Sequence, residues 1–214
     1  SHIPCKPILG VYESAEFPNL VAVDKRNGGK GDAQNAGINV SRYPLFCTID
    51  GDSLLEEDAL LRVARPFHDY PGQIVATGGT IRIANGSLVR AGRITDARLA
   101  HALLPRIQAV EYLRAFLFGR MGWSSFGGLL LISGAFGIFD KQVVVEAGGY
   151  ATDSVGEDME LVIRVHRVLR DRGRSYRIGF VPEPVCWTEA PESLRVLGRQ
   201  RERWQRGLID TLLR

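Results

Sequence analysis

Short apolar runs alternate with helical patterns along this chain of 214 residues, and this alternation restricts its fold more than any other feature. Residues 45–49 and 176–181 are predicted strands, because apolar runs of four to eight residues are typical of a sheet interior. Residues 105–119 and 157–171 show helical periodicity instead. Strands that alternate with helices predict an α/β layered domain.

The same patterns predict the remaining elements. We expect strands at residues 19–23, 74–77, 79–83, 129–132 and 137–139, and helices at residues 32–40, 54–65 and from 191 to the end. Ser53 and Glu56 have the spacing of a capping box for the helix at 54–65. The pair Asn85-Gly86 predicts a tight turn before Leu88.

Composition limits the size and class of the domain. With 45% hydrophobic residues the chain can bury one sizeable core, so we expect residues 1–214 to form a single domain. The formal charge of +3 is too small to indicate a nucleic-acid partner, which needs a broad cationic surface.

The longest apolar stretch, residues 126–139, is shorter than the roughly 20 residues that span a bilayer. Three distant cysteines without CxxC spacing favour a reducing compartment over disulfides or zinc.

A motif with two carboxylates, Asp50-Gly51-Asp52, directly follows the predicted strand at 45–49. Ligands of open α/β sheets collect at the carboxyl ends of strands, so these acids are placed to hold a divalent cation. Mg²⁺ is typically bound by one or two carboxylates together with substrate phosphates, which makes a sugar diphosphate a natural ligand. Alternatively, Asp50 and Asp52 only shape the turn and favour the next helix N-terminus.

A second acidic motif, Gly156-Glu157-Asp158, opens the predicted helix at 157–171. A carboxylate at such a junction can face a cleft and accept a proton from a sugar hydroxyl. The alternative is that both acids only complement the helix dipole.

Lys30 lies in a Gly-rich loop before the predicted helix at 32–40. Glycines let the backbone approach a phosphate, and a lysine supplies a point charge. Most lysines at loop tips bind nothing, so the motif by itself does not distinguish a phosphate-binding lysine from an ordinary surface lysine.

The predicted helix at 191–214 is amphipathic. With 3.6 residues per turn, one stripe contains Leu194, Leu197, Arg201, Trp204, Leu208 and Leu212. Gln200, Arg203 and Gly207 lie along one border of that stripe, so we expect leucines to anchor the helix while Gln200, Arg203 and Trp204 line a site. The alternatives are an ordinary surface helix, or a cluster of arginines that contacts phosphates or anionic lipid.

In their order and spacing, these segments resemble glycosyltransferase family two, which includes cellulose, hyaluronan and poly-N-acetylglucosamine synthases. The poly-N-acetylglucosamine synthase-like branch is the most similar. The resemblance rests on Gly29 to Gly37, Asp50-Gly51-Asp52, Ser133 to Gly137, Gly148-Gly149-Tyr150, Gly156-Glu157-Asp158, and Gln200 with Arg203-Trp204. It covers almost the whole chain and implies a GT-A fold, a Rossmann-like mixed sheet flanked by helices.

The resemblance also implies a role for each motif. The donor-binding residues would be Lys30, Asp50, Asp52, Gln200, Arg203 and Trp204, of which Asp50 and Asp52 would hold Mg²⁺ or Mn²⁺. The acceptor path would be lined by Ser133, Gly134, Ala135, Phe136 and Trp204. Asp158 would be the general base, with Glu157 beside it.

The implied reaction is an inverting transfer from a nucleotide sugar, UDP-N-acetylglucosamine or another UDP-hexose, to a hydroxyl of a glycan or lipid-linked acceptor. Asp158 removes the hydroxyl proton during attack on the anomeric carbon, and positive charge stabilises the departing diphosphate. The implied location is the cytoplasmic face of the cell membrane, with the membrane reached through segments outside this chain.

Members of the family begin this domain with a strand and an acidic pair that hold the nucleotide. Nothing before Lys30 supplies them, since Asp24 lies too close to it, so we expect a fragment that lacks the first portion of the domain. Two alternatives remain. A sugar nucleotidyltransferase of similar fold would need a Gly-rich N-terminal segment that is not seen, and a non-catalytic domain could bind a partner or membrane through the last helix.

Overall fold

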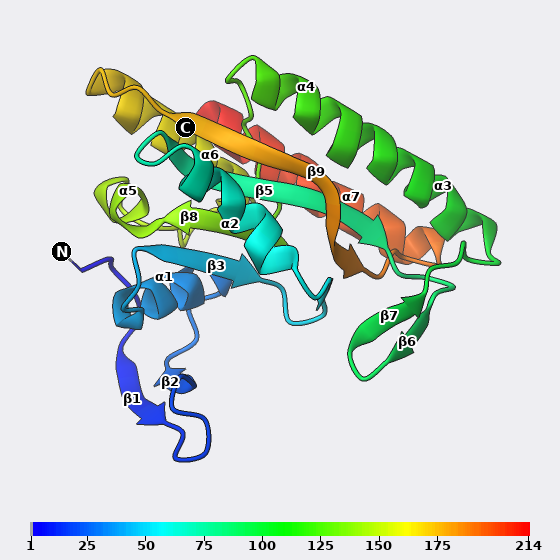
Figure 1. The fold of residues 1–214 in the computed structure, drawn as a ribbon, viewed down its shortest axis with the longest axis horizontal. Coiled ribbons are helices and arrows are strands. Elements are labelled where there is room, and N and C mark those ends of the chain that lie inside the picture. Colours follow the sequence, from blue (N-terminus) through cyan, green and yellow to red (C-terminus); the bar gives the residue numbers. More distant parts are fainter. Residues whose placement is uncertain (1) are drawn as a thin grey trace.

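The computed structural model describes residues 2–214, and its centre is a five-stranded mixed sheet with helices on both sides (Figure 1). The strand order is β3 (Leu45–Ile49), β8 (Phe136–Asp140), β5 (Ile74–Ile83), β9 (Arg177–Thr188) and β4 (Leu54–Leu55). Strands β5 and β9 are parallel, whereas the other neighbours are antiparallel. The predicted α/β class with a mixed sheet is confirmed.

Two small hairpins lie outside this sheet. Strand β1 (Ile8–Glu13) pairs with β2 (Val21–Lys25), and β6 (Leu88–Arg90) pairs with β7 (Arg93–Asp96). Figure 1 shows both hairpins projecting from the body, the first below α1 and the second at the opposite end. Neither adds a strand to the five-stranded sheet, in which β3 is an edge.

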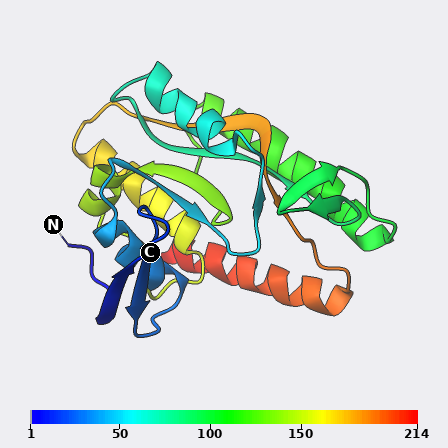
Figure 2. The same ribbon diagram turned by 60° about the horizontal axis from the view of Figure 1, so that its bottom comes forward.

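The helices cover both faces of the sheet. Their bounds are α1 (Lys30–Val40), α2 (Ala59–Asp69), α3 (Leu103–Tyr112), η1 (Leu113–Phe118), α4 (Gly119–Ser125), α5 (Lys141–Glu146), α6 (Glu157–Asp171) and α7 (Leu194–Leu213). Helices α3 and α4 form one continuous run through the π-helical segment η1. Figures 1 and 2 show α2 and α7 on opposite sides of the sheet.

The core consists of two buried clusters, each joining helices to the sheet. Helix α6 contributes Leu161, Val165 and Leu169, which recur every four residues and therefore share one helix face. In the second cluster, Val63 of α2 packs with residues of β5, β8 and β9, and its carbonyl accepts a hydrogen bond of 2.7 Å from the Thr77 hydroxyl. Full burial of each such aliphatic side chain contributes about 1.5–3 kcal/mol to the stability of the folded state.

The predicted helix at 54–65 and its capping box are wrong. Leu54 and Leu55 instead pair with Trp187 and Cys186 of β9, and helix α2 begins only at Ala59. The carboxylate of Glu56 accepts a hydrogen bond of 2.7 Å from the Trp187 indole nitrogen. Pairing with a strand that is distant in the sequence therefore overrides the local capping signal.

Two strand predictions also need correction. Residues 74–77 and 79–83 belong to one strand, β5, because both halves pair with β9 and Gly78 between them is paired as well. Residues 129–132 form no strand, although Leu129 and Ile132 are buried as a strand interior would be. The Leu129 carbonyl lies 2.9 Å from the His166 Nε2 of α6, so a side chain satisfies it instead of a neighbouring strand.

Candidate active site

A cavity of about 860 Å³ opens at one end of the sheet and collects most of the predicted site residues. These are Lys30, Asp50, Asp52, Ser133, Gly134, Ala135, Glu157, Asp158, Gln200, Arg203 and Trp204. Phe136 is the exception, because its side chain is fully buried in the core and does not line the cavity. Of the turn that was expected to line the acceptor path, residues 133–135 are therefore at the cavity and the Phe136 side chain is not.

Antiparallel pairing explains why two of these segments meet. Strand β3 ends at Ile49, which pairs with Phe136 at the start of β8. Beyond this pair, the Asp50 amide donates to the Ala135 carbonyl at 3.3 Å. The carboxylates after β3 therefore lie beside the turn at residues 133–135.

Lys30 connects the acidic motifs electrostatically. Its Nζ lies 2.5 Å from Oδ1 of Asp50 and 3.7 Å from Oε1 of Glu157. The same ammonium donates to the Gly134 carbonyl at 3.2 Å. Because the Lys30 side chain is 41% exposed, these pairs contribute little to stability, and their effect is to set charge and geometry in the cavity.

The Asp158 carboxylate is held in place by two backbone amides. Oδ2 accepts from Gly134 at 3.0 Å and Oδ1 accepts from Met159 at 2.8 Å. Each carboxylate oxygen has two lone pairs, so both can still accept a proton or hydrogen bond from a ligand. The arrangement orients the carboxylate without using up its acceptor capacity.

Glu157 has a perturbed environment beside Asp158. Burial raises the pKa of the Glu157 carboxyl, and the negative charge of Asp158 raises it further, whereas Lys30 acts in the opposite direction. Carboxyl groups whose pKa is shifted by burial and by a neighbouring charge are concentrated at functional sites.

Helix α7 is anchored by small residues. Its buried positions are Gly207 and Thr211. Of the predicted leucine anchor, Leu197 and Leu208 are half-buried, whereas Leu194 and Leu212 are 76% and 69% exposed, so only its middle part packs against the protein. A Cβ added to Gly207 would lie 3.0 Å from the Gly156 Cα, which shows that the two backbones touch. This close approach turns the Gln200 and Arg203 border of the helix toward the cavity.

Trp204 forms part of the cavity wall and is 36% exposed. Its ring meets the edge of Phe116 at a centroid distance of 6.4 Å, and the Arg201 guanidinium lies over it at 4.5 Å. Arg201 is itself paired with Glu111 at 2.5 Å. The helical run from α3 to α4 therefore supports the position of Trp204.

The same helical run contributes cavity residues that were not predicted from the sequence. Tyr112, Phe116 and Arg120 line the cavity, and their spacing of four residues places them on one helix face. That spacing was available in the sequence as a signal. Nothing in it indicated that an arginine on this face would be buried.

The residues at the cavity fit a divalent cation. Asp50 and Asp52 both line it. Across residues 2–214, no larger group of three or more His, Cys, Asp or Glu side chains is arranged to hold a metal, so these two carboxylates would be its protein ligands. Mg²⁺ commonly needs only one or two carboxylates, with phosphate and water oxygens completing its shell. The ion pair between Lys30 and Asp50 would have to loosen for both carboxylates to bind.

Comparisons with known proteins identify the fold and the family of this chain. The structure is similar to that of the mannosyltransferase PcManGT from Pyrobaculum calidifontis, which was solved in complex with GDP-Man and Mn²⁺. The TM-score is 0.57 and the sequence identity is 16%, and the match covers 88% of this chain and 44% of that one. This similarity shows a GT-A fold. A family model described as glycosyl transferase family group 2 matches residues 45–214, and the chain belongs to that family.

Curated relatives give the same family assignment. The chain is 31% identical over 205 residues to the poly-beta-1,6-N-acetyl-D-glucosamine synthase of Staphylococcus aureus (strain COL), covering 95% of this chain and 45% of the relative. Identity to the synthase of the same name from Staphylococcus epidermidis is 29%, with the same coverage. The chain thus spans less than half the length of these relatives. Within residues 2–214, no helix combines the length and apolar character needed to cross a bilayer.

Proposed function

We propose that residues 1–214 form a catalytic domain of an inverting glycosyltransferase that moves a sugar from a nucleotide-sugar donor to a hydroxyl of a glycan or lipid-linked acceptor. The observation that carries the proposal is that Asp52, Asp158 and Trp204, which are remote in the sequence, line one cavity. The names of the relatives favour UDP-N-acetylglucosamine over other UDP-hexoses as donor.

The donor diphosphate is assigned to the side of the cavity with Lys30, Asp50 and Asp52. Lys30 supplies positive charge close to Asp50, so the two can exchange partners when a diphosphate enters. A divalent cation bound by Asp50 and Asp52 would supply the charge that neutralises the departing nucleoside diphosphate. Arg203 at the α7 border adds a second cationic side chain to the same cavity.

Asp158 is assigned as the general base. Two backbone amides fix its carboxylate, and its oxygens keep free lone pairs for an acceptor hydroxyl. As that hydroxyl oxygen bonds to the anomeric carbon, its proton passes to Asp158 and the bond to the diphosphate oxygen breaks. Attack from the face opposite the diphosphate inverts the configuration.

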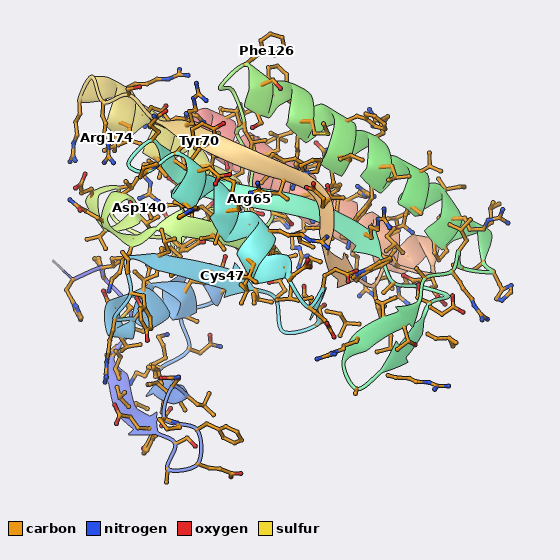
Figure 3. The ribbon with its side chains drawn as sticks, viewed as in Figure 1. Cys47, Arg65, Tyr70, Phe126, Asp140 and Arg174 are labelled. Atoms are coloured by element: carbon orange, nitrogen blue, oxygen red, sulfur yellow. The ribbon has the colours of Figure 1, made fainter. Side chains whose placement is uncertain are left out.

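The cytoplasmic face of the membrane is assigned as the location. Exposed apolar side chains follow the run from α3 to α4, including Val110, Phe118, Trp123 and Phe126 at 68%, 71%, 64% and 88% exposure. Figure 3 shows Phe126 pointing outward at the end of α4. Such a strip suits a membrane surface or the membrane segments of a larger protein.

The proposal is tested by transfer from a labelled donor. The full-length protein is incubated with UDP-N-acetylglucosamine, UDP-glucose or GDP-mannose, Mg²⁺ or Mn²⁺, and an N-acetylglucosamine oligosaccharide. The expected product is an elongated oligosaccharide whose new linkage has the opposite anomeric configuration to the donor, as read by NMR. A retained configuration, or formation of a nucleotide sugar from a sugar phosphate, would contradict the proposal.

A further inference from the structure

Arg120 is a buried cation that lines the cavity. Its side chain makes no ion pair within residues 2–214, the residue is 6% exposed, and its Nη1 has no hydrogen-bond partner there. The guanidinium lies over the Phe116 ring, 4.2 Å from the centroid. Burial lowers the pKa of Arg120 to about 10, against the opposing influence of Asp158. A buried charged donor without a partner is costly, so its presence requires an explanation.

A second unpartnered group lines the same cavity. The Gln200 Oε1 is buried and, in the described part of the chain, accepts no hydrogen bond. Arg120 therefore offers a hydrogen-bond donor and Gln200 offers an acceptor. A hydroxyl accepts and donates at once, so the hydroxyls of a carbohydrate can satisfy both groups.

The position of Arg120 favours the acceptor sugar over the donor diphosphate. Phe116 contacts both the Arg120 guanidinium, which lies over its ring, and Trp204, which it meets in an edge arrangement. The carboxylate whose charge acts on Arg120 is that of Asp158. Lys30 and Asp50, on the proposed donor side, are instead paired with each other.

We propose that Arg120 is a substrate-binding residue that donates a hydrogen bond to an acceptor-sugar hydroxyl and holds that sugar beside Asp158, while Gln200 accepts from the same sugar. The inference rests on the proposed glycosyl transfer and adds a specificity-determining contact to it. Arg120 keeps its proton throughout, because the proton of the attacking hydroxyl passes to Asp158.

The test compares Arg120→Met, Arg120→Lys and the control Arg114→Met in the full-length protein. Arg114 is exposed on the same helical run. Loss of a hydrogen bond from a charged donor is expected to raise the acceptor KM of Arg120→Met by roughly tenfold or more. Arg120→Lys should lie between wild type and Arg120→Met, and Arg114→Met should match wild type. UDP affinity, measured by calorimetric titration, should be the same in all four proteins.

Thermal unfolding without substrate separates binding from a structural role. Replacing an unpaired buried charge with an apolar side chain is not expected to destabilise, so Arg120→Met should melt at or above the wild-type temperature. Lower melting temperatures in both Arg120 variants, with acceptor KM unchanged, would overturn the inference.

A binding experiment keeps the inference separate from the proposed function. If the wild type transfers no sugar, the glycosyl transfer proposal fails, and the oligosaccharide is titrated directly into wild type and Arg120→Met. Weaker binding by the variant supports the Arg120 contact. Equal binding by the two proteins, or no binding by either, contradicts it.

Discussion

The backbone amide of Gly134 donates a hydrogen bond of 3.0 Å to Oδ2 of Asp158. The turn before β8 thereby fixes the carboxylate at the start of α6, although the two residues belong to different elements. Because Lys30 donates to the carbonyl of the same Gly134, one peptide segment connects the proposed base to the proposed donor side of the cavity.

Replacing Asp158 with Asn should remove the base but keep the shape of the site. The amide oxygen can still accept from one of the two backbone amides, and the side chain keeps its size, but it cannot take the acceptor proton, so we expect turnover to fall by about 10²–10⁴-fold. UDP affinity should stay within twofold of wild type, roughly the error of a titration. Asp171→Asn, at the other end of α6, is the control. Unchanged turnover in Asp158→Asn would exclude this residue as the base.

Replacing Asp52 with Ala should weaken metal-dependent donor binding. Asp52 lines the cavity beside Asp50, so its loss leaves one carboxylate for a cation. We expect calorimetry to show weaker UDP binding in the presence of Mn²⁺ and no difference from wild type in EDTA. Equal affinities under both conditions would contradict the metal assignment.

Replacing Gly207 with Ala should displace α7. An added methyl group would press on the Gly156 backbone at about 3.0 Å, so we expect destabilisation of about 1–3 kcal/mol and reduced transfer. Gly198→Ala is a matched control on the same helix, because its Cβ would meet nothing within 4 Å. That control should stabilise by up to about 1 kcal/mol through helix propensity. Urea unfolding measures both, and similar shifts in the two variants would contradict backbone contact at Gly207.

Glu157 should make stability depend on pH. Its pKa is raised in the folded protein, so above the usual value of 4.5 the folded state binds more protons than the unfolded state. The contribution of Glu157 to the free energy of unfolding is therefore largest at low pH, and it is lost as the pH rises through the pKa of the folded state. We expect Glu157→Gln to stabilise the protein more at pH 7 than at pH 4 in urea unfolding experiments. The reverse order would mean that the pairing with Lys30 outweighs burial.

Local patterns predicted the elements whose periodicity is strong and self-contained. Strand β3 and helix α6 have the predicted bounds, because each carries an uninterrupted apolar pattern. The start of α2 was mispredicted since Leu54 and Leu55 are paired with β9, more than a hundred residues away in the chain. Propensity within a short window contains no information about such a partner.

The candidate site was predicted to the extent that its motifs are contiguous in the sequence. The acids at Asp50, Asp52 and Asp158 were identified from their position after a strand or before a helix, and the structure places them in one cavity. Arg120 was missed because its burial depends on tertiary packing around the helical run, which a pattern within that run does not show. The anchoring of α7 was predicted only in part for a related reason, since helical periodicity cannot show that a glycine meets the backbone of Gly156.

With no side chain between Gly156 and Gly207, the two positions constrain each other as a matched pair. A methyl group at either one removes the space that the other occupies, so tolerance to substitution at one site is conditional on the residue at the other. Attempts to redesign the C-terminal helix, for example to accept a different sugar, therefore have to preserve this contact or replace both glycines together.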